Sequence, residues 1–191
     1  MSGPDNESVA GLAERATGEL AAVVGQVPDD ALAEACAAII GARRIAVYGV
    51  GREGLMMRAL TMRLYHLGLD AHVVGDMTTP AVGSGDLLVV SAGPGHFATV
   101  EALMEVAREA GAPVLVFTAR SNAPLVAAAD HVVRLPARTM AGAESDGDAV
   151  LPMGSAYEGA QYLFFELLVR ALGQRLGCDE QAMRERHTNL E

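Results

Sequence analysis

The residues IAVYGVGREGL (45–55) combine a short apolar run, a glycine-rich loop and the start of a helix. The run IAVYG (45–49) is rich in residues that favour β-strands, and helical spacing predicts a helix from about Glu53 to Leu67. The glycines let backbone N–H groups approach an anion at the beginning of that helix. This strand, loop and helix therefore predict one unit of an α/β fold.

Four further apolar runs follow and alternate with predicted helices. They are AHVVG (71–75), LLVVS (87–91), PVLVFTA (113–119) and HVVRLP (131–136). Most are apolar throughout rather than at every second position, which is typical of parallel strands that are buried on both faces. The intervening helices are expected at about 99–110 and 123–130. The pattern predicts a doubly wound α/β fold, in which a parallel sheet lies between two layers of helices.

The two ends of the chain add helices to this core. Apolar spacing predicts an amphipathic helix over 8–26 and a second helix that Pro28 opens and Gly41 ends. Residues 137–153 are predicted to form a mobile loop, either a lid or a plain surface loop, and a long helix is predicted over 155–176. We expect a single domain (1–191) with N-terminal helices (8–41), a sheet core (43–136), the loop (137–153) and C-terminal helices with a polar tail (154–191).

Charge and composition exclude several kinds of chemistry. The chain has 191 residues, with 24 acidic and 14 basic side chains and a formal net charge of −10. Every basic side chain is an arginine, so Schiff-base aldolases, enzymes that bind pyridoxal phosphate as an internal aldimine, and P-loop NTPases are all excluded. The acidic balance also argues against nucleic acids and anionic membranes as partners.

Neither targeting signals nor metal ligands are indicated. No run approaches the ~18 apolar residues of a transmembrane helix, and the first residues lack the basic and apolar blocks of a signal peptide. Cys36 and Cys178 are isolated thiols without metal-ligand spacing, which fits a reducing cytoplasm. We therefore expect a cytoplasmic protein that uses no metal and no other cofactor.

The glycine loop also fits a dinucleotide-binding pattern in part. Gly49, Gly51 and Gly54 match G-x-G-x-x-G. That pattern needs an acidic residue about 20 residues further on, after the second strand. The nearby Asp70 precedes the second predicted strand instead of ending it, so the sequence does not favour NAD binding.

Three ordered segments resemble the sugar isomerase (SIS) domain family, and within it the 6-phospho-3-hexuloisomerases. They are MRL-x-HLG (62–68), GD-x-TTP-A (75–81) and RH-x-NLE (186–191). The resemblance implies a five-stranded parallel sheet between helices and a tetramer with sites shared between subunits. It also implies conversion of a 3-ketose phosphate into a 2-ketose phosphate through an enediolate. This chemistry needs a carboxylate or imidazole base and donors that face the developing oxyanion, but no metal.

The resemblance also marks three candidate catalytic residues. Glu158 matches the family's glutamate at the start of the long helix and is the leading candidate for the base, although Ser155-x-x-Glu158 also fits a helix capping box. His66 would open the sugar ring or polarise the carbonyl, or would simply pack at a helix end. His187 would shuttle protons from a tail placed in a neighbour's site, or would be solvated.

Candidate substrate contacts lie in three loops. Arg52 matches an arginine of the family's first loop and suits phosphate or polyol contacts, whereas Arg63 is expected to form a salt bridge. The predicted substrate-binding residues are Gly51, Arg52, Glu53, Thr78, Thr79, Ser91, Gly93, Gly95 and His96.

Two of these loops depart from the family pattern. In the first loop, usually G-x-G-R-S-G, Glu53 replaces the serine. In the second, usually S-G-S-G-E-T, the chain reads AGPGHF (92–97), and Pro94 also removes a backbone donor. Each lost hydrogen bond to an ionised group is worth about 1.5–3 kcal/mol. We expect Glu53 to pair with an arginine and His96 or Ser91 to compensate in part.

The altered loops leave three functions open. The first is a 6-phospho-3-hexuloisomerase-like enzyme that acts on a small-molecule sugar phosphate as a homo-oligomer. The second is an isomerase of the same fold that acts on a different sugar or sugar-acid derivative. The third is a non-catalytic module that binds sugar phosphates, which the fold alone does not exclude.

Overall fold

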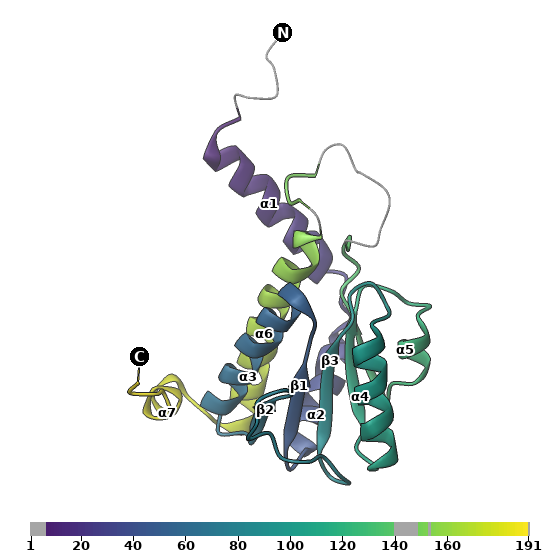
Figure 1. Ribbon diagram of the computed structural model, residues 1–191. Coiled ribbons are helices and arrows are strands. Elements are labelled where there is room, and N and C mark those ends of the chain that lie inside the picture. Colours follow the sequence, from purple (N-terminus) through teal and green to yellow (C-terminus); the bar gives the residue numbers. More distant parts are fainter. Residues whose placement is uncertain (1–6, 140–148, 153, 191) are drawn as a thin grey trace.

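The structure is a computed structural model that describes residues 7–139, 149–152 and 154–190. Its centre is a five-stranded sheet in which all strand pairs are parallel, in the order β2-β1-β3-β4-β5 (Figure 1). The strands are β1 (Ile45–Tyr48), β2 (Ala71–Val73), β3 (Leu87–Ser91), β4 (Val114–Thr118) and β5 (His131–Arg134). In this order the chain leaves β1 toward one side of the sheet and β3 toward the other. The loops after β1 and β3 therefore diverge at the point where parallel α/β sheets bind their ligands.

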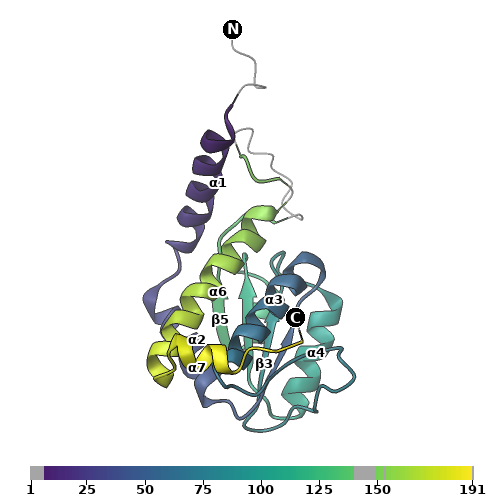
Figure 2. The same ribbon diagram turned by 90° about the vertical axis from the view of Figure 1, so that its left-hand side faces the viewer.

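Helices cover both faces of the sheet, as Figure 2 shows. One face carries α2 (Asp29–Gly41), α3 (Gly51–His66) and α6 (Ser155–Leu176), and the other carries α4 (Ala98–Glu109) and α5 (Pro124–Ala127). The helix α1 (Val9–Val24) contacts α6 and extends beyond the sheet, and α7 (Glu180–Glu185) lies near the C-terminus (Figures 1 and 2). The predicted three-layer α/β architecture is therefore confirmed.

The two faces of the sheet have separate hydrophobic cores. Along β3, Leu87 and Val89 pack with α2, α3 and α6, whereas Leu88 and Val90 pack with α4. Successive side chains of a strand point to opposite faces, so a strand between two helical layers must be apolar at every position. This explains the continuous apolar runs. None of the described helices is long and apolar enough to span a membrane.

Most element boundaries agree with the predictions within two residues, but some differ. Pro28 lies just before α2, in extended conformation, instead of in its first turn. The helix expected over 123–130 is the single turn Pro124–Ala127. Of the loop predicted over 137–153, residues 140–148 and 153 lie outside the described residues, so its proposed role as a lid is untested.

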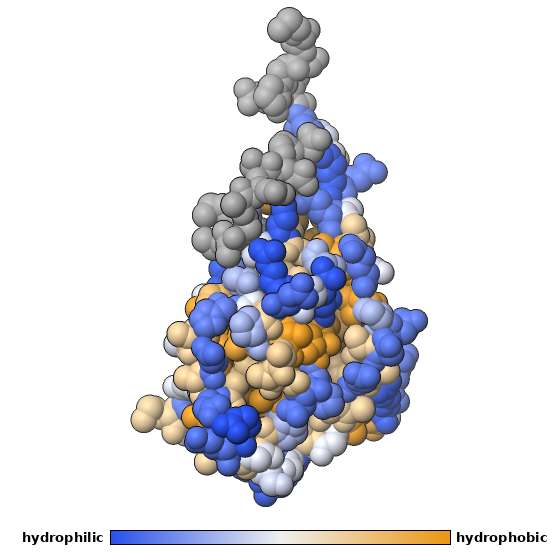
Figure 3. All heavy atoms as spheres, turned by 90° about the vertical axis from the view of Figure 1, so that its right-hand side faces the viewer, coloured by the Kyte–Doolittle hydropathy of each residue, from blue (hydrophilic) through white to orange (hydrophobic). Residues whose placement is uncertain are grey.

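The surface has apolar areas on more than one side. On the side of α4 and α5, apolar residues gather in the middle of the face and are surrounded by hydrophilic ones (Figure 3). The helices α3 and α6 contact each other, and several of their large apolar side chains are exposed. They are Leu55, Met62, Tyr65, Tyr162, Leu163 and Leu167.

Candidate active site

A cavity of about 640 Å³ opens where α3, α6 and the loop after β3 meet. This loop, residues 92–97, is called the β3 loop below. The cavity volume falls within the range typical of small-molecule sites. Its lining consists of Val50, Gly51, Arg52, Glu53, Pro94, His96, Phe97, Thr139, Tyr157 and Glu158. The cavity thus brings together Glu158 and the first-loop residues that the sequence analysis had selected separately.

Glu158 lies in the first turn of α6 and lines this cavity, with 15% of its side chain exposed. Its Oε2 atom is 3.2 Å from Nη2 of Arg52. Burial raises the pKa of Glu158, and the positive charge of Arg52 opposes that rise. The arrangement holds a charged carboxylate whose proton affinity is higher than that of a solvated glutamate, which is what a general base requires.

The capping box that Ser155 and Glu158 could form as an alternative to the catalytic role of Glu158 is absent. The N-cap of α6 is Gly154, which has a φ of 81° and makes no side-chain cap hydrogen bond. Ser155 is the first helical residue, and its hydroxyl accepts a hydrogen bond from Nη1 of Arg52 at 2.9 Å. The Glu158 carboxylate is therefore not occupied by a helix cap. Arg52 instead ties the start of α3 to the start of α6.

Glu53 is a second buried carboxylate of the cavity, only 6% exposed. Its Oε2 atom accepts hydrogen bonds from the Ser91 hydroxyl at 2.5 Å and from the Gly93 N–H at 3.0 Å. Burial is the main cause that raises the pKa of Glu53, and the negative charge of Glu158 adds to it. The expected pairing of Glu53 with an arginine is wrong, because among the described residues its ionic and hydrogen-bonding partners are these two neutral donors.

The Ser91 hydroxyl and the Gly93 N–H therefore donate to a side chain of the protein itself. Ser91 is fully buried, and its hydroxyl accepts a hydrogen bond from Nε2 of Gln161 at 2.8 Å. The Tyr157 hydroxyl lies 3.3 Å from the same oxygen and donates to it, because the Ser91 proton is directed at Glu53. Ser91 therefore does not compensate for the lost hydroxyls of the β3 loop as expected.

Tyr157, Gln161 and Thr139 are site residues that the sequence analysis missed. Tyr157 and Gln161 are four residues apart on α6, a spacing that places them on the same helix face. Thr139 is 6% exposed and lines the cavity, and its hydroxyl has no hydrogen-bond partner among the described residues. In the sequence, only the four-residue spacing of Tyr157 and Gln161 could have indicated that they belong to the site. Nothing in the sequence around Thr139 indicates that it does.

The rest of the β3 loop is tightly folded. Pro94 has no N–H, and the Gly95 N–H donates to the Ala92 carbonyl at 2.8 Å. Gly95 has a φ of 94°, which favours glycine. At Gly93 a Cβ atom would lie 2.6 Å from the Tyr157 ring. Both glycines thus serve the loop's conformation, whatever further role they have toward a ligand.

His96 lies at the mouth of the cavity, where its side chain is 57% exposed. Its Nδ1 atom is 3.8 Å from a carboxylate oxygen of Glu101. This position keeps His96 available to a ligand, in agreement with the prediction, but does not test that role.

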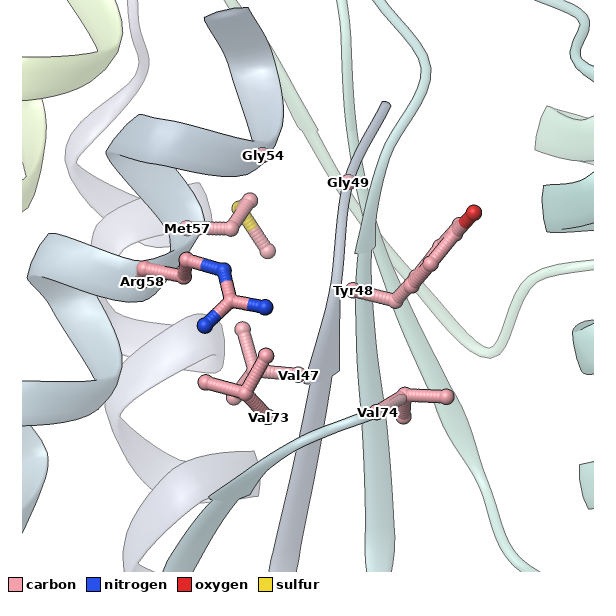
Figure 4. Close-up of a pocket in the computed structure, with 8 residues that line it drawn as sticks. All are labelled: Val47, Tyr48, Gly49, Gly54, Met57, Arg58, Val73 and Val74. Atoms are coloured by element: carbon pink, nitrogen blue, oxygen red, sulfur yellow. The ribbon is translucent and has the colours of Figure 1, made fainter. Parts of the chain in front are cut away.

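The structure does not bring Thr78 and Thr79 to this cavity. Both follow β2, where the Thr79 hydroxyl donates to the Val73 carbonyl and Thr78 is exposed. A separate cavity of about 60 Å³ lies between α3, β1 and β2 (Figure 4). Its walls are formed mainly by apolar side chains such as Met57 and Val73, with the Arg58 guanidinium beside them. Neither threonine lines this cavity.

His66 and His187 lie together, but far from Glu158 of the same chain. Their rings stack with centroids 5.0 Å apart and planes at 27°. Nη1 of Arg186 donates to the His66 carbonyl at 3.1 Å and fixes the tail to the end of α3. Arg52 and His66 are 14 residues apart on α3. With a rise of about 1.5 Å per residue, they are therefore separated by about 21 Å along the helix axis. Figure 1 shows α7 beside the end of α6, at the opposite end of this helix from its beginning.

Arg63 forms the predicted salt bridge. Its Nη2 atom lies 3.4 Å from the Glu166 carboxylate of α6, where it joins α3 to α6 away from the cavity. Arg58 contacts Asp76 at 3.7 Å.

Residues 38–158 match the family model of the SIS domain. The chain therefore belongs to the SIS domain family, as the resemblance had indicated. The 3-hexulose-6-phosphate isomerase of Mycobacterium gastri is 35% identical over 175 residues, which cover 91% of this chain and 86% of that protein. The protein of the same name from Bacillus subtilis is 30% identical over 153 residues, with coverage of 80% and 83%.

A solved structure supports the same relationship. It is that of a Methanococcus jannaschii protein for which the function of a 3-hexulose-6-phosphate isomerase was inferred. Its TM-score to this chain is 0.81 at 27% sequence identity, over 94% of this chain and 98% of that one.

Proposed function

We propose that the protein is a cofactor-independent ketose isomerase that interconverts a 3-ketose and a 2-ketose through an enediolate. The observation that carries the proposal is the partly buried Glu158 carboxylate, which lines a cavity large enough for a sugar and is paired with Arg52. The relatives named 3-hexulose-6-phosphate isomerase support the reaction type. Their substrate, 3-hexulose 6-phosphate, is therefore the reference substrate.

In this proposal Glu158 takes a proton from the carbon next to the carbonyl. The electron pair of that C–H bond forms the double bond of the enediolate, and the carbonyl oxygen becomes negatively charged. The guanidinium of Arg52 stabilises this oxygen, since it already lies beside Glu158. Glu158 then returns the proton to the former carbonyl carbon, while the proton of the neighbouring hydroxyl passes to the enediolate oxygen. The carbon that bore this hydroxyl becomes the new carbonyl, so the overall reaction gains and loses neither protons nor electrons.

His66 and His187 are proposed to act in the site of a neighbouring copy of the chain. They are too far from Glu158 of their own chain, by the length of α3, to share its substrate. The exposed apolar side chains of α3 and α6 support association into a dimer or tetramer, because burying them removes apolar surface from water. A shared site would give the two histidines the roles in ring opening and proton transfer that the sequence analysis assigned to them.

A second candidate function keeps this reaction but changes the substrate. It is favoured by one observation, the Glu53 carboxylate that occupies the donors of Ser91 and Gly93. In this case the sugar is not anchored by a phosphate at the β3 loop.

Deuterium incorporation tests the reaction type directly. The purified protein is incubated in deuterated water with 3-hexulose 6-phosphate and with a panel of ketoses and sugar acids, and carbon-bound deuterium is followed by NMR. We expect exchange at the carbons next to the carbonyl, and its loss in Glu158→Gln. The matched control Glu105→Gln, at an exposed ion pair on α4, should exchange like the wild type. Ligand binding without exchange on any substrate would instead indicate a binding module.

Subunit mixing tests the shared site. Glu158→Gln and His66→Asn proteins are prepared separately and should each be inactive. Mixed under conditions that allow subunit exchange, they should recover activity, because some sites then combine an intact Glu158 with an intact His66. Recovery of no activity, with mixed oligomers verified by mass spectrometry, would contradict the proposal.

A further inference from the structure

The β3 loop already holds a carboxylate that belongs to the protein. Glu53 reaches from the first turn of α3 to the end of β3 and accepts hydrogen bonds from the Ser91 hydroxyl and the Gly93 N–H. A loop between a strand and a helix N-terminus presents such donors to anions. In this chain the anion is supplied from within, so these two donors have no free capacity for a ligand.

The neighbouring positions of the loop do not replace them. Pro94 lacks an N–H, and the Gly95 N–H is directed at the Ala92 carbonyl. Phe97, just before α4, adds an apolar side chain to the cavity wall. The Ser91 hydroxyl and the N–H groups of Gly93 and Gly95 thus all donate to acceptors of the protein itself.

The charges of the cavity also disfavour an anion. Within the described part of the chain, its ionisable lining residues are Arg52, Glu53, Glu158 and His96. Two carboxylates oppose one guanidinium, which is itself engaged by Glu158. Together these four side chains carry a net charge of −1 when His96 is neutral and 0 when it is protonated. A phosphate dianion beside the buried Glu53 would meet like charge in a poorly solvated space.

The same cavity is suited to hydroxyl groups. Oε2 accepts both described hydrogen bonds of Glu53, so Oε1 retains its capacity to accept a hydrogen bond from a ligand. The buried Thr139 hydroxyl, without a partner among the described residues, can both donate and accept. The remaining lining from Val50, Pro94 and Phe97 is apolar and complements the carbon face of a sugar.

We infer that Glu53 closes the β3 loop to phosphate, and that this loop holds an uncharged, hydroxyl-bearing end of the substrate. The inference rests on the proposed function and chooses between its two substrate classes: the favoured substrate is a ketose without a phosphate at the end that meets the β3 loop. Glu53 is thus a specificity-determining residue.

The test measures binding and does not require turnover. Isothermal titration calorimetry compares inorganic phosphate, fructose and fructose 6-phosphate with the wild type, Glu53→Ser, and the double variant Glu53→Ser/Pro94→Ser, at constant ionic strength. We expect the Kd of the wild type for fructose 6-phosphate to be no more than threefold lower than its Kd for fructose, a ratio on the order of what neutral hydrogen bonding provides. A wild type that binds neither sugar with a Kd below 10 mM also agrees with the inference. At least one Glu53→Ser protein should bind fructose 6-phosphate and phosphate about tenfold or more tightly than the wild type does.

Two results would overturn the inference. One is a wild type that binds fructose 6-phosphate at least tenfold more tightly than fructose. The other is the absence of any gain for phosphate in both serine variants. Because Glu53 is buried, each variant is first checked by its melting temperature without ligand. Glu53→Gln, which keeps the volume and removes the charge, provides a second route to the same gain if the serine variants do not fold.

Two controls separate this inference from the proposed function. Glu105→Ser removes an exposed carboxylate of α4 and should leave all three affinities unchanged. Glu158→Gln removes the other carboxylate of the lining and is expected to abolish isomerisation. It should gain less affinity for phosphate than Glu53→Ser does, because it leaves Glu53 on the donors of Ser91 and Gly93. A protein that never catalyses exchange but gains phosphate binding in Glu53→Ser would contradict the proposed function and leave the role of Glu53 standing.

Discussion

The two glutamates that line the cavity, Glu53 and Glu158, lie in contrasting surroundings. Glu158 lines the cavity beside a guanidinium, whereas Glu53 is held by a hydroxyl and a backbone N–H at the end of β3 and in the loop after it. Burial raises the pKa of both. The contrast shows that burial alone does not assign a role to a carboxylate. The partner decides whether it is poised to take a proton or is fixed as part of the binding surface.

The largest effect is expected at the reacting end. Glu158→Gln keeps the shape of the side chain but cannot take a proton, so kcat should fall about 10²–10⁴-fold, the range for loss of a general base. The melting temperature should change little, because the Arg52 contact is partly solvated. Steady-state kinetics and thermal unfolding check both statements. A variant that retains activity within tenfold would remove Glu158 from the mechanism.

Arg52→Ala is expected to have the second largest effect. Loss of the guanidinium removes the donor for the enediolate oxygen, and kcat should fall about 10²-fold. Arg52 also lowers the pKa of Glu158, so its removal should raise that pKa further. Since the base acts when deprotonated, the acidic limb of the pH–rate profile should move to higher pH. A profile with an unmoved acidic limb would show that Arg52 does not act on Glu158.

Glu53→Gln should alter the pH dependence of stability. The folded state holds the pKa of Glu53 above its ordinary value of 4.5, so the folded protein binds this proton more tightly than the unfolded chain does. The associated stability is fully present below the unfolded pKa and is lost as the pH rises through the folded pKa.

The wild type should therefore lose unfolding free energy relative to Glu53→Gln as the pH rises across this window. Urea unfolding at a series of pH values measures the difference, with Glu105→Gln as a control for an exposed carboxylate. Parallel curves for the wild type and Glu53→Gln would mean that burial does not raise the pKa of Glu53 in the folded protein.

The smallest effect is expected for Tyr157→Phe. The Tyr157 hydroxyl is 3.3 Å from Ser91, which is a long hydrogen bond, and Ser91 keeps its contacts with Glu53 and Gln161. The free energy of unfolding should fall by no more than about 1 kcal/mol, and kcat should stay within a fewfold of the wild type. Denaturant unfolding and kinetics test this. A loss comparable to that of Glu158→Gln would give Tyr157 a direct part in the reaction.

Much of the fold and the family could be predicted from the sequence. The sheet follows from apolar runs that are continuous because helices bury both strand faces, and the long helix was predicted with its observed ends. The motifs around residues 62–68 and 75–81 pointed to the SIS domain family, which the family model confirms. Arg52, Glu53, His96 and Glu158 were selected from the sequence, and all four line the cavity.

The partners of these residues could not be predicted. Local spacing allowed a capping box at Ser155 because it gave no account of Arg52, which is 103 residues away and hydrogen-bonds the same serine. Thr139 was missed because its burial depends on the elements around the cavity and not on its neighbours in the chain.

The absence of lysine and the net charge of −10 are properties of the sequence alone, and they exclude whole classes of chemistry without any structure. The alternation of strands and helices is likewise determined locally, because hydrophobic periodicity depends on residues that are close in the chain. Where the Glu53 carboxylate lies was decided only by the tertiary structure. Its partners are 38 and 40 residues away, and the packing of α3 against the end of β3 brings them within hydrogen-bonding distance.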